Sequence, residues 1–259
     1  MAKPEEGKMC GRMTLTRSGN EIAEYFALAA ETGAKVVEEG LQQQARHNIA
    51  PSQPVATVTG ATPGKRVLHW RHWGLVPAWS SPNKTSGRLF NARSETTKQK
   101  PSFREAWKRR RCLVVADGFY EWTPRNRGHQ PFHFHRPDFS ILAFAGLFEE
   151  WKGDEGETFE SCTVLTTAAN RDLEGIHHRM PVILAPEKFS DWLNTEHADF
   201  GLKAMMQPAP TGTLLRQAVG RAVNDPRFDE PSCLEPAVIE DSLQGDLFGS
   251  ATRGLEGTE

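Results

Sequence analysis

Cys10 is the residue whose chemistry depends most on its place in the chain. A cysteine at the start of a chain presents an α-amine beside its thiol, and this 1,2-aminothiol traps an aldehyde as an imine and then closes a thiazolidine ring. About 14% of an α-amine is unprotonated at pH 7, against about 0.04% of a lysine amine, so the terminal amine is the better nucleophile. Aldehyde capture therefore requires Cys10 as the first residue. The alternative is a buried structural cysteine.

Nine residues precede Cys10 in the sequence. We expect translation to start at Met9, with the initiator methionine removed because the small cysteine follows it, or residues 1–9 to be cut off autocatalytically. Residues 1–8 are then an N-terminal extension that the mature protein lacks.

Glu121 is a second candidate for chemistry. It lies in the aromatic run Phe119-Tyr120-Glu121-Trp122, and an apolar setting favours the neutral, proton-donating form of a carboxyl group. The alternative is a structural role in which Glu121 caps a backbone turn.

Three other patterns indicate structure rather than chemistry. Gly60–Arg66 is one residue short of a phosphate loop and has no serine or threonine after its lysine, so it predicts a hairpin turn. His133 and His135 share a strand face without acidic or cysteine ligands, which favours a half-exposed strand over a metal site. Cys112 and Cys162 lie in apolar segments and predict inert core residues. We expect neither a metal nor another cofactor.

The hydrophobic pattern predicts the elements that must position these residues. Strands are expected near residues 55–58, 67–73, 112–116, 132–135, 141–148, 162–167 and 182–184. Helices are expected over Glu21–Ala30, from a capping-box pattern at Ser102–Glu105 into the basic run Lys108–Arg111, and over Pro186–Thr195. Residues 34–44 fit either a short helix or a loop. Because strands dominate without a regular β-α-β alternation, we expect an α+β fold whose largely antiparallel sheets form a barrel- or sandwich-like core with flanking helices.

Charge is distributed unevenly along the chain. The net charge is −2 over 259 residues, but residues 88–136 contain 12 basic and 4 acidic residues, and residues 225–259 contain 2 basic and 9 acidic residues. This distribution predicts a polyanion site on one surface and a solvated appendage elsewhere. We expect one domain over residues 9–236 and an acidic flexible tail over residues 237–259.

The composition excludes several classes of protein. With 38% hydrophobic residues the chain is neither disordered throughout nor fibrous. The longest apolar run, Ile141–Phe148, is too short for a membrane span, and no signal peptide is visible. Four widely spaced cysteines without a Cys-x-x-Cys pair argue against a disulfide scaffold. We expect a cytoplasmic protein, nucleoid-associated in a bacterium, with no membrane partner.

Seven motifs follow one another in a characteristic order. They are Met9-Cys10-Gly11-Arg12, Asn48-Ile49-Ala50-Pro51, Trp73-Gly74-Leu75-Val76-Pro77 with Trp79, Phe90-Asn91-Ala92-Arg93-Ser94-Glu95, Gly118-Phe119-Tyr120-Glu121-Trp122, His177-His178-Arg179-Met180-Pro181 and Ala222-Val223-Asn224. In these motifs the sequence resembles the SOS response-associated peptidase (SRAP) family of abasic-site-processing proteins. The resemblance extends over roughly Met9–Pro236.

The resemblance implies how the site would work. An abasic site in DNA exposes an aldehyde in its ring-opened sugar, which the aminothiol of Cys10 would capture. Glu121 would be the general acid and base, His177 would stabilise the ring-opened sugar and assist imine chemistry, and Asn91 would hold the cysteine amine and the sugar. On spacing alone, His178 could be exchanged with His177. The family also implies autopeptidase and abasic-site lyase activities.

The resemblance further implies contacts with single-stranded DNA. Motif arginines are candidates for phosphate contacts, tryptophans for base stacking, and two smaller polar residues for backbone contacts. These residues are Arg12, Arg93, Arg179, Trp79, Trp122, Asn48 and Thr166. Core packing is the alternative for both tryptophans, and Ser80 stands where some relatives have a second aromatic residue. The run Lys108–Arg111 either extends the DNA path or solvates a helix end.

The tail contains one further motif. Gln244-Gly245-Asp246-Leu247-Phe248 resembles the short bacterial sliding-clamp-binding peptide, in which Gln244, Leu247 and Phe248 enter a hydrophobic groove. A polar tail gains little from exposing Leu247 and Phe248 unless something binds them. This favours the replication clamp as a partner.

The sequence thus predicts an abasic-site sensor that binds single-stranded DNA, crosslinks to it through Cys10 and shields the lesion in the DNA damage response. Two other functions stay open. One is a thiol peptidase with Cys10 as nucleophile and His177 and Glu121 as base and orienting group. The other is a non-catalytic module that binds single-stranded DNA.

Overall fold

The computed structural model describes residues 11–31, 45–85, 89–124, 129–196 and 201–237, without the side chains of residues 84 and 85. Several sequence predictions lie outside these residues. They concern the extension 1–8, Cys10, the segment 34–44, and the tail beyond Ala237 with its motif at 244–248.

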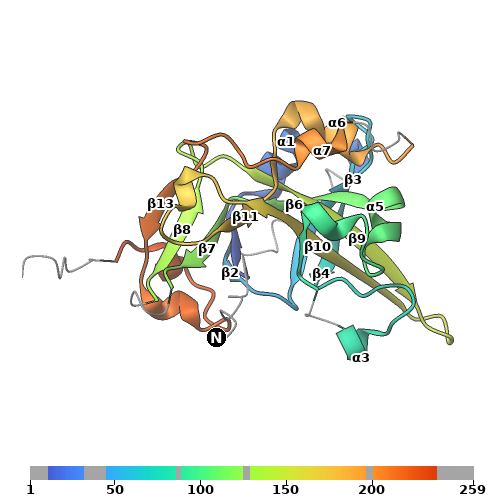
Figure 1. Cartoon of the computed structure of the whole chain (residues 1–259), viewed down its shortest axis with the longest axis horizontal. Coiled ribbons are helices and arrows are strands. Elements are labelled where there is room, and N and C mark those ends of the chain that lie inside the picture. Colours follow the sequence, from blue (N-terminus) through green and yellow to red (C-terminus); the bar gives the residue numbers. More distant parts are fainter. Residues whose placement is uncertain (1–10, 32–44, 86–88, 125–128, 197–200, 238–259) are drawn as a thin grey trace, which may run out of the picture.

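One sheet has five strands and is antiparallel throughout. Its order is β13-β8-β7-β1-β2, and Figure 1 shows β13, β8 and β7 on the left. Phe119 of β7 pairs with Met13 on one side and with Phe134 on the other. The strands are β1 (Met13–Leu15), β2 (Arg46–Ile49), β7 (Gly118–Trp122), β8 (Pro131–His135) and β13 (Leu215–Ala218).

Five further strands close into a barrel. The pairs β4–β3, β3–β6, β6–β9 and β9–β10 are antiparallel. A parallel pairing of β10 with β4, in which Ser161 lies opposite His72, closes the ring. These strands are β3 (Pro54–Thr59), β4 (Val67–Trp73), β6 (Arg111–Ala116), β9 (Leu142–Lys152) and β10 (Thr158–Ala168).

Three short strands extend this barrel. β5 (Asn91–Arg93) pairs in parallel with β10, and β11 (Arg179–Pro181) pairs antiparallel with the last residues of β10. β12 (Ile183–Leu184) pairs with β9. Two predicted motifs, around Asn91 and Arg179, therefore meet along one strand.

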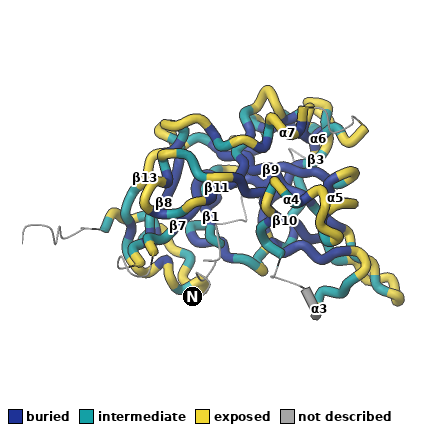
Figure 2. The backbone as a smooth tube through the Cα atoms, viewed as in Figure 1, coloured by how far each residue is buried: buried dark blue, intermediate teal, exposed yellow. Residues whose placement is uncertain are grey.

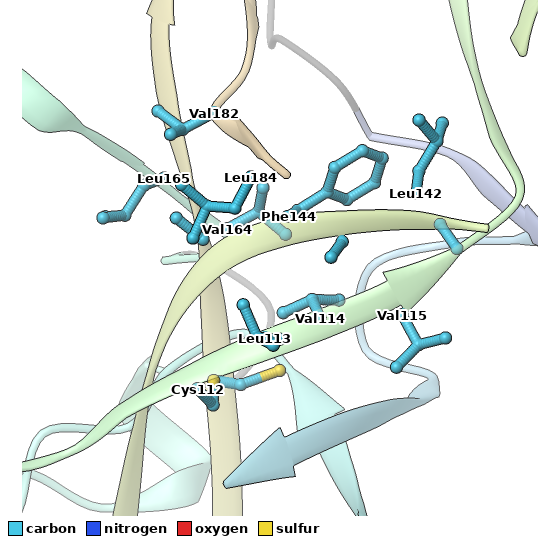
Figure 3. Close-up of a cluster of buried hydrophobic side chains, with 14 of the residues drawn as sticks. Cys112, Leu113, Val114, Val115, Leu142, Phe144, Val164, Leu165, Val182 and Leu184 are labelled. Atoms are coloured by element: carbon cyan, nitrogen blue, oxygen red, sulfur yellow. The ribbon is translucent and has the colours of Figure 1, made fainter. Parts of the chain in front are cut away.

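The core fills the barrel and the space beneath its helices. All six residues of β6 are buried, because β6 packs on the barrel interior on one face and beneath α6 on the other, where Trp192 Nε1 donates to the Cys112 carbonyl at 2.8 Å. Val114 and Phe144 lie close together within this cluster (Figure 3), and the buried segments of Figure 2 follow the same strands. Cys112 and Cys162 are fully buried, which confirms the prediction of core residues.

The helices are short and lie around the two sheets. α1 and α6 pack together through stacked rings of Phe26 and Phe189, whose centroids are 5.4 Å apart. The α-helices are α1 (Gly19–Phe26), α3 (Pro82–Thr85), α4 (Ser94–Thr97), α5 (Arg104–Arg109), α6 (Phe189–Leu193) and α7 (Leu202–Met205). The 3₁₀ turns are η2 (Arg171–Leu173), η3 (Pro186–Lys188), η4 (Arg221–Asn224) and η5 (Pro231–Leu234). Among the described residues, no helix has the length and apolar character needed to cross a membrane.

The α+β fold with mainly antiparallel sheets and a barrel-like core is confirmed. Gly60–Arg66 forms the predicted turn, between β3 and β4. The helix expected to end near Ala30 ends at Phe26, because Ala27 adopts a left-handed conformation and its N–H bonds back to the Glu24 carbonyl. Ser18 and Glu21 form a capping box at its start.

Three local predictions are wrong. The capping box at Ser102–Glu105 is absent, because α5 starts after Phe103 and the Arg104 N–H already bonds to the Lys100 carbonyl. His133 and His135 do not form a half-exposed pair, since both are buried, at 6% and 5% exposure. The basic run Lys108–Arg111 is not one exposed surface, because Arg111 is buried.

Candidate functional site

Arg12 directly precedes β1 and follows Cys10 by two residues. Its carbonyl accepts the backbone N–H of Tyr120 at 3.0 Å, which extends the pairing of β1 with β7. Its Nη1 donates to Asn48 Oδ1 at 2.6 Å and to the Val223 carbonyl. The guanidinium also lies 5.7 Å from the ring centroid of Trp122. Arg12 therefore joins two strands to the C-terminal part of the domain.

Asn48 connects the end of β2 to a C-terminal clasp, which we define as residues 221–236 with η4 and η5. Its Nδ2 donates to the carbonyls of Val223, Asp225 and Phe228, at 3.2, 3.0 and 2.6 Å. Its backbone N–H donates to Asp229 Oδ1 at 2.8 Å. Asn48 is fully buried, so its amide holds the clasp and orients Arg12, and a contact of Asn48 with DNA stays a prediction.

Glu121 and Trp122 end β7 beside Arg12. Glu121 is buried, with 3% exposure, opposite Phe132 of β8. The Trp122 Nε1 donates to Asn224 Oδ1 of the clasp at 2.7 Å, and its ring packs against a small second core that includes Tyr120. β7 thus places Glu121, the predicted general acid and base, and Trp122, a predicted stacking residue, next to Arg12.

A buried polar network of Thr14, Asp117 and His133 lies beside β7. Asp117 Oδ1 accepts the Thr14 hydroxyl at 2.5 Å, and Thr14 Oγ1 lies 3.2 Å from His133 Nε2. Burial, reinforced by the neighbouring His135, lowers the pKa of His133 to about 3, so this ring is neutral. Since Thr14 gives its only hydroxyl proton to Asp117, His133 must donate from Nε2. The described residues hold no group of three or more side chains that could ligate a metal ion.

Arg179 lies in a second group of predicted residues, on β5, β10 and β11. Its guanidinium forms a bidentate pair with Glu95, with Nη2 to Oε2 at 2.8 Å, and donates to the Thr166 carbonyl at 2.6 Å. Thr166 is fully buried opposite Arg93 in the register of β10 with β5. Arg179 is itself 8% exposed. In this structure Arg179 joins α4 to β10 and β11, and its contact with phosphate stays a prediction.

His177 precedes β11 and is half-buried. The Arg179 N–H donates to its Nδ1 at 3.0 Å, which leaves the ring proton on Nε2 in the neutral form. Burial lowers the pKa of His177, and the neighbouring His178, whose ring stacks on it at 4.6 Å, lowers it further. Burial therefore favours the neutral ring, and the shorter contact of the Arg179 N–H with Nδ1, compared with 3.3 Å from Nδ1 to the Arg179 carbonyl, favours the tautomer with its proton on Nε2.

Trp79 and Arg93 are exposed. Trp79 is 69% exposed, so the core-packing alternative for Trp79 is wrong and its ring face is accessible for stacking. Arg93 ends β5 on the surface, and Asn91 begins β5 at intermediate exposure. Both lie within the motif that continues into α4.

The contacts therefore sort the predicted residues into two groups. The five-stranded sheet holds Arg12, Asn48, Glu121 and Trp122, and the strands β5, β10 and β11 hold or adjoin Asn91, Arg93, Thr166, His177 and Arg179. Sequence reasoning missed Glu95, Asn224 and Asp229, which hold these residues in place. Glu95 and Asn224 lie inside recognised motifs, whereas no local pattern points to Asp229.

Replacing Glu95 by glutamine is expected to lower the free energy of unfolding at pH 7 by about 1 to 2 kcal/mol, because the nearly buried Arg179 loses its counter-charge while the half-exposed position of Glu95 screens the pair. The hydrogen bonds from Arg179 lower the pKa of Glu95 in the folded state. The difference in the free energy of unfolding between wild type and Glu95→Gln should therefore fade as the pH falls from about 4.5 through the lower pKa that Glu95 has in the folded state. Urea unfolding across this pH range measures it.

Glu105→Gln is the matched control for Glu95→Gln. Glu105 pairs with Lys108 on the surface, with both side chains more than half exposed. Its loss should change the free energy of unfolding by less than about 0.5 kcal/mol. Equal effects of the two variants at pH 7 would show that Arg179 does not depend on Glu95.

The barrel, the added sheet and the ordered motifs define a known class. The family model of the SOS response associated peptidase (SRAP) matches residues 9–226, and the chain belongs to this family. The abasic site processing protein YoqW of Bacillus subtilis is 36% identical over 231 residues, which cover 88% of this chain and 99% of YoqW. The abasic site processing protein HMCES of Gallus gallus is 31% identical over 262 residues, covering 88% of this chain and 78% of HMCES.

Solved structures agree on the fold. A crystal structure of a Bacteroides thetaiotaomicron protein superposes with a TM-score of 0.76 at 23% identity, over 88% of this chain and all of that chain. A Bordetella bronchiseptica protein superposes with a TM-score of 0.66 at 27% identity, over 82% of this chain and all of that chain.

Proposed function

We propose that this chain processes abasic sites in single-stranded DNA by forming a thiazolidine link through Cys10. The relatives are named for abasic site processing, and the contact of the Tyr120 N–H with the Arg12 carbonyl is the observation that supports the chemistry best. Arg12 follows Cys10 by two residues, and Glu121 follows Tyr120 in β7. The pairing of β1 with β7 therefore supports a role for Glu121 in the chemistry of Cys10.

The reaction divides into two steps. The α-amine of Cys10 attacks the sugar aldehyde, and the resulting carbinolamine loses water to form an imine, for which Glu121 donates the proton to the leaving hydroxyl group. The thiol sulfur then adds to the imine carbon, and its proton passes to the nitrogen, closing the five-membered ring. The neutral His177 donates Nε2–H to a sugar oxygen, and Asn91 orients the amine.

DNA binding fits two exposed residues, Trp79, which belongs to neither group, and Arg93 of the second group. Trp79 offers an accessible face to an unpaired base, where stacking stabilises binding by about 1 to 3 kcal/mol. Arg93 lies on the surface beside Asn91 and supplies a phosphate contact. The same imine intermediate accounts for a lyase activity at abasic sites. Self-cleavage before Cys10 is the peptidase activity that the family name suggests.

The test is incubation of the mature protein with single-stranded DNA in which uracil-DNA glycosylase has created one abasic site. We expect a protein–DNA complex that survives denaturation. The control DNA has its aldehyde capped with methoxyamine and should give no complex. An equal yield from capped and uncapped DNA would contradict aldehyde capture, and intact mass of the protein identifies the form that reacts.

We also propose that the tail binds the replication clamp. Leu247→Ala combined with Phe248→Ala should abolish recovery of the clamp in a pull-down with the full chain, because both side chains fill the groove. The tail also contains Leu243 and Leu255, so the double variant Leu243→Ala, Leu255→Ala is the control and should bind as wild type does. Equal recovery by all three proteins would remove the clamp as a partner.

A further inference from the structure

α5 has one face fixed to the core and one face exposed. Phe103, Ala106 and Trp107 are buried, and the Trp107 ring meets the Trp192 ring edge-on with centroids 5.8 Å apart. The remaining surface is open, since the side chains of Arg104 and Lys108 are 58% and 63% exposed. The burial of one face thus orients the charged residues of the other toward solvent.

Three exposed cations form what we call the basic ridge: Arg104 and Lys108 on this face of α5, and Lys100 in the turn before the helix. The Arg104 N–H bonds to the Lys100 carbonyl at 3.0 Å, so Lys100 belongs to the turn that leads into the helix. Arg104 and Lys108 are four residues apart and lie on one helix face with a rise of about 6 Å between them. Together with Lys100 they present several positive charges in succession, which suits the successive phosphates of an extended strand.

The charge of the ridge is only partly compensated. Glu105 is the carboxylate that pairs here, 3.3 Å from Lys108 Nζ and 3.9 Å from Arg104 Nε. Arg104 and Lys108 are like charges four residues apart, an arrangement that destabilises a helix by a few tenths of a kcal/mol. Their pairs with Glu105 offset this repulsion in part, and bound phosphates would offset it further.

The ridge begins where the candidate site ends. Arg93 directly precedes α4, and the Lys100 N–H bonds to the Thr96 carbonyl of α4 at 3.2 Å. A continuous series of turns therefore leads from the β5 motif to α5. Figure 2 shows α4 and α5 close together, with exposed segments along α5.

Two of the three arginines of the predicted basic run, Arg110 and Arg111, hold the fold together, whereas Arg109 is exposed at the end of α5. Arg110 pairs with Glu149 at 2.8 Å. Arg111 is buried and donates to the carbonyls of Trp107, Trp192 and Asn194. The structure thus separates cations that hold the barrel from cations that face solvent.

We propose that the basic ridge is a second phosphate-binding surface, which holds the single strand on one side of the lesion after it passes Arg93. This inference rests on the proposed binding of single-stranded DNA. It adds a defined binding surface, built from residues outside the seven family motifs.

The experiment uses lesion-free single strands of two lengths, one limited to the nucleotides around the site and one extended on both sides. The variant is Lys100→Gln, Arg104→Gln, Lys108→Gln in the full chain. Affinity is measured over a series of salt concentrations. For the long strand we expect the slope of log affinity against log salt to become shallower by about 2, since each phosphate contact on a single strand contributes about 0.7. The short strand should bind as it does to wild type.

The control removes the same charge elsewhere, in Lys65→Gln, Lys188→Gln, Lys203→Gln, whose residues are exposed on the β3–β4 turn, η3 and α7. Slopes that are equal for the variant and this control overturn the ridge proposal. Extending the strand on the 5′ or the 3′ side alone shows which side lies on the ridge, because only that extension should be affected.

The ridge and the proposed function fail in different measurements. If wild-type protein gives no denaturation-resistant complex with a short abasic strand, the proposed crosslink is contradicted. The salt dependence of affinity for lesion-free strands still tests the ridge. A variant that crosslinks the short strand at the wild-type rate but shows the wild-type slope on the long strand contradicts the ridge alone.

Discussion

Cys10→Ala is expected to abolish the denaturation-resistant complex with abasic single-stranded DNA. Alanine retains the α-amine but has no thiol, so any imine that forms stays reversible and hydrolyses during denaturation. The fold should be unchanged, since β1 begins at Met13, three residues later. Gel analysis after heating in detergent measures the complex, and thermal unfolding checks the fold.

Two further forms separate the chemistry of the amine from that of the thiol. Cys10→Ser should yield an imine that borohydride reduction traps but that heating removes. Wild-type protein with an acetylated Cys10 amine retains the thiol and should give no complex. If the acetylated protein crosslinks normally, the thiol alone is the nucleophile, and the peptidase-like alternative replaces the thiazolidine mechanism.

Gly118→Ala is expected to cost about 3 kcal/mol of folding free energy, the upper end for overpacking a core. A Cβ atom at this position would lie 2.1 Å from His133 Nε2 and 2.9 Å from the Phe134 carbonyl oxygen. The His133 ring has no room to withdraw, because it stacks on His135 and packs against Tyr120. For a chain of this size, the melting temperature should fall by about 6 to 12 °C.

Gly220→Ala is the control for this substitution. Gly220 has ordinary backbone angles, with φ −60°, and a Cβ atom there would meet nothing within 4 Å. Its replacement should change the folding free energy by less than about 1 kcal/mol. Similar melting temperatures for the two variants would mean that His133 moves aside at little cost.

The sequence predicts the barrel strands because their burial shows in local composition. Ile141–Phe148 and Cys162–Thr167 are apolar runs. The first lies in the longer strand β9 except for Ile141, which directly precedes it, and the second lies inside the longer strand β10. β7 was not predicted as a strand, since Gly118 and Glu121 interrupt its apolar pattern. The two positions are explained by long-range contacts: the glycine makes room for His133, and the carboxylate is buried at the candidate site.

The candidate site was less predictable than the fold, for a physical reason. Motifs identify residue types, but partners arise from pairs far apart in sequence, such as Arg179 with Glu95, 84 residues away, and Asn48 with Phe228, 180 residues away. The same reason explains why Arg111 is buried although its basic run is typical of a surface. Its guanidinium donates to the carbonyls of Trp192 and Asn194, at and just after the end of α6. The chemical roles of Asn91, Glu121 and His177 stay predictions until the variants are measured.

The bond between Arg12 and the Val223 carbonyl has a consequence for the order of events during synthesis. The two residues are 211 positions apart, and the clasp that also holds Asn48 follows at residues 221–236. A chain still emerging from the ribosome can therefore pair β1 with β7, but the Arg12 guanidinium and the Asn48 amide still lack their partners in the clasp. These side chains are fixed only once nearly the whole domain has been translated, so an unfinished chain lacks part of the arrangement that we propose for aldehyde capture.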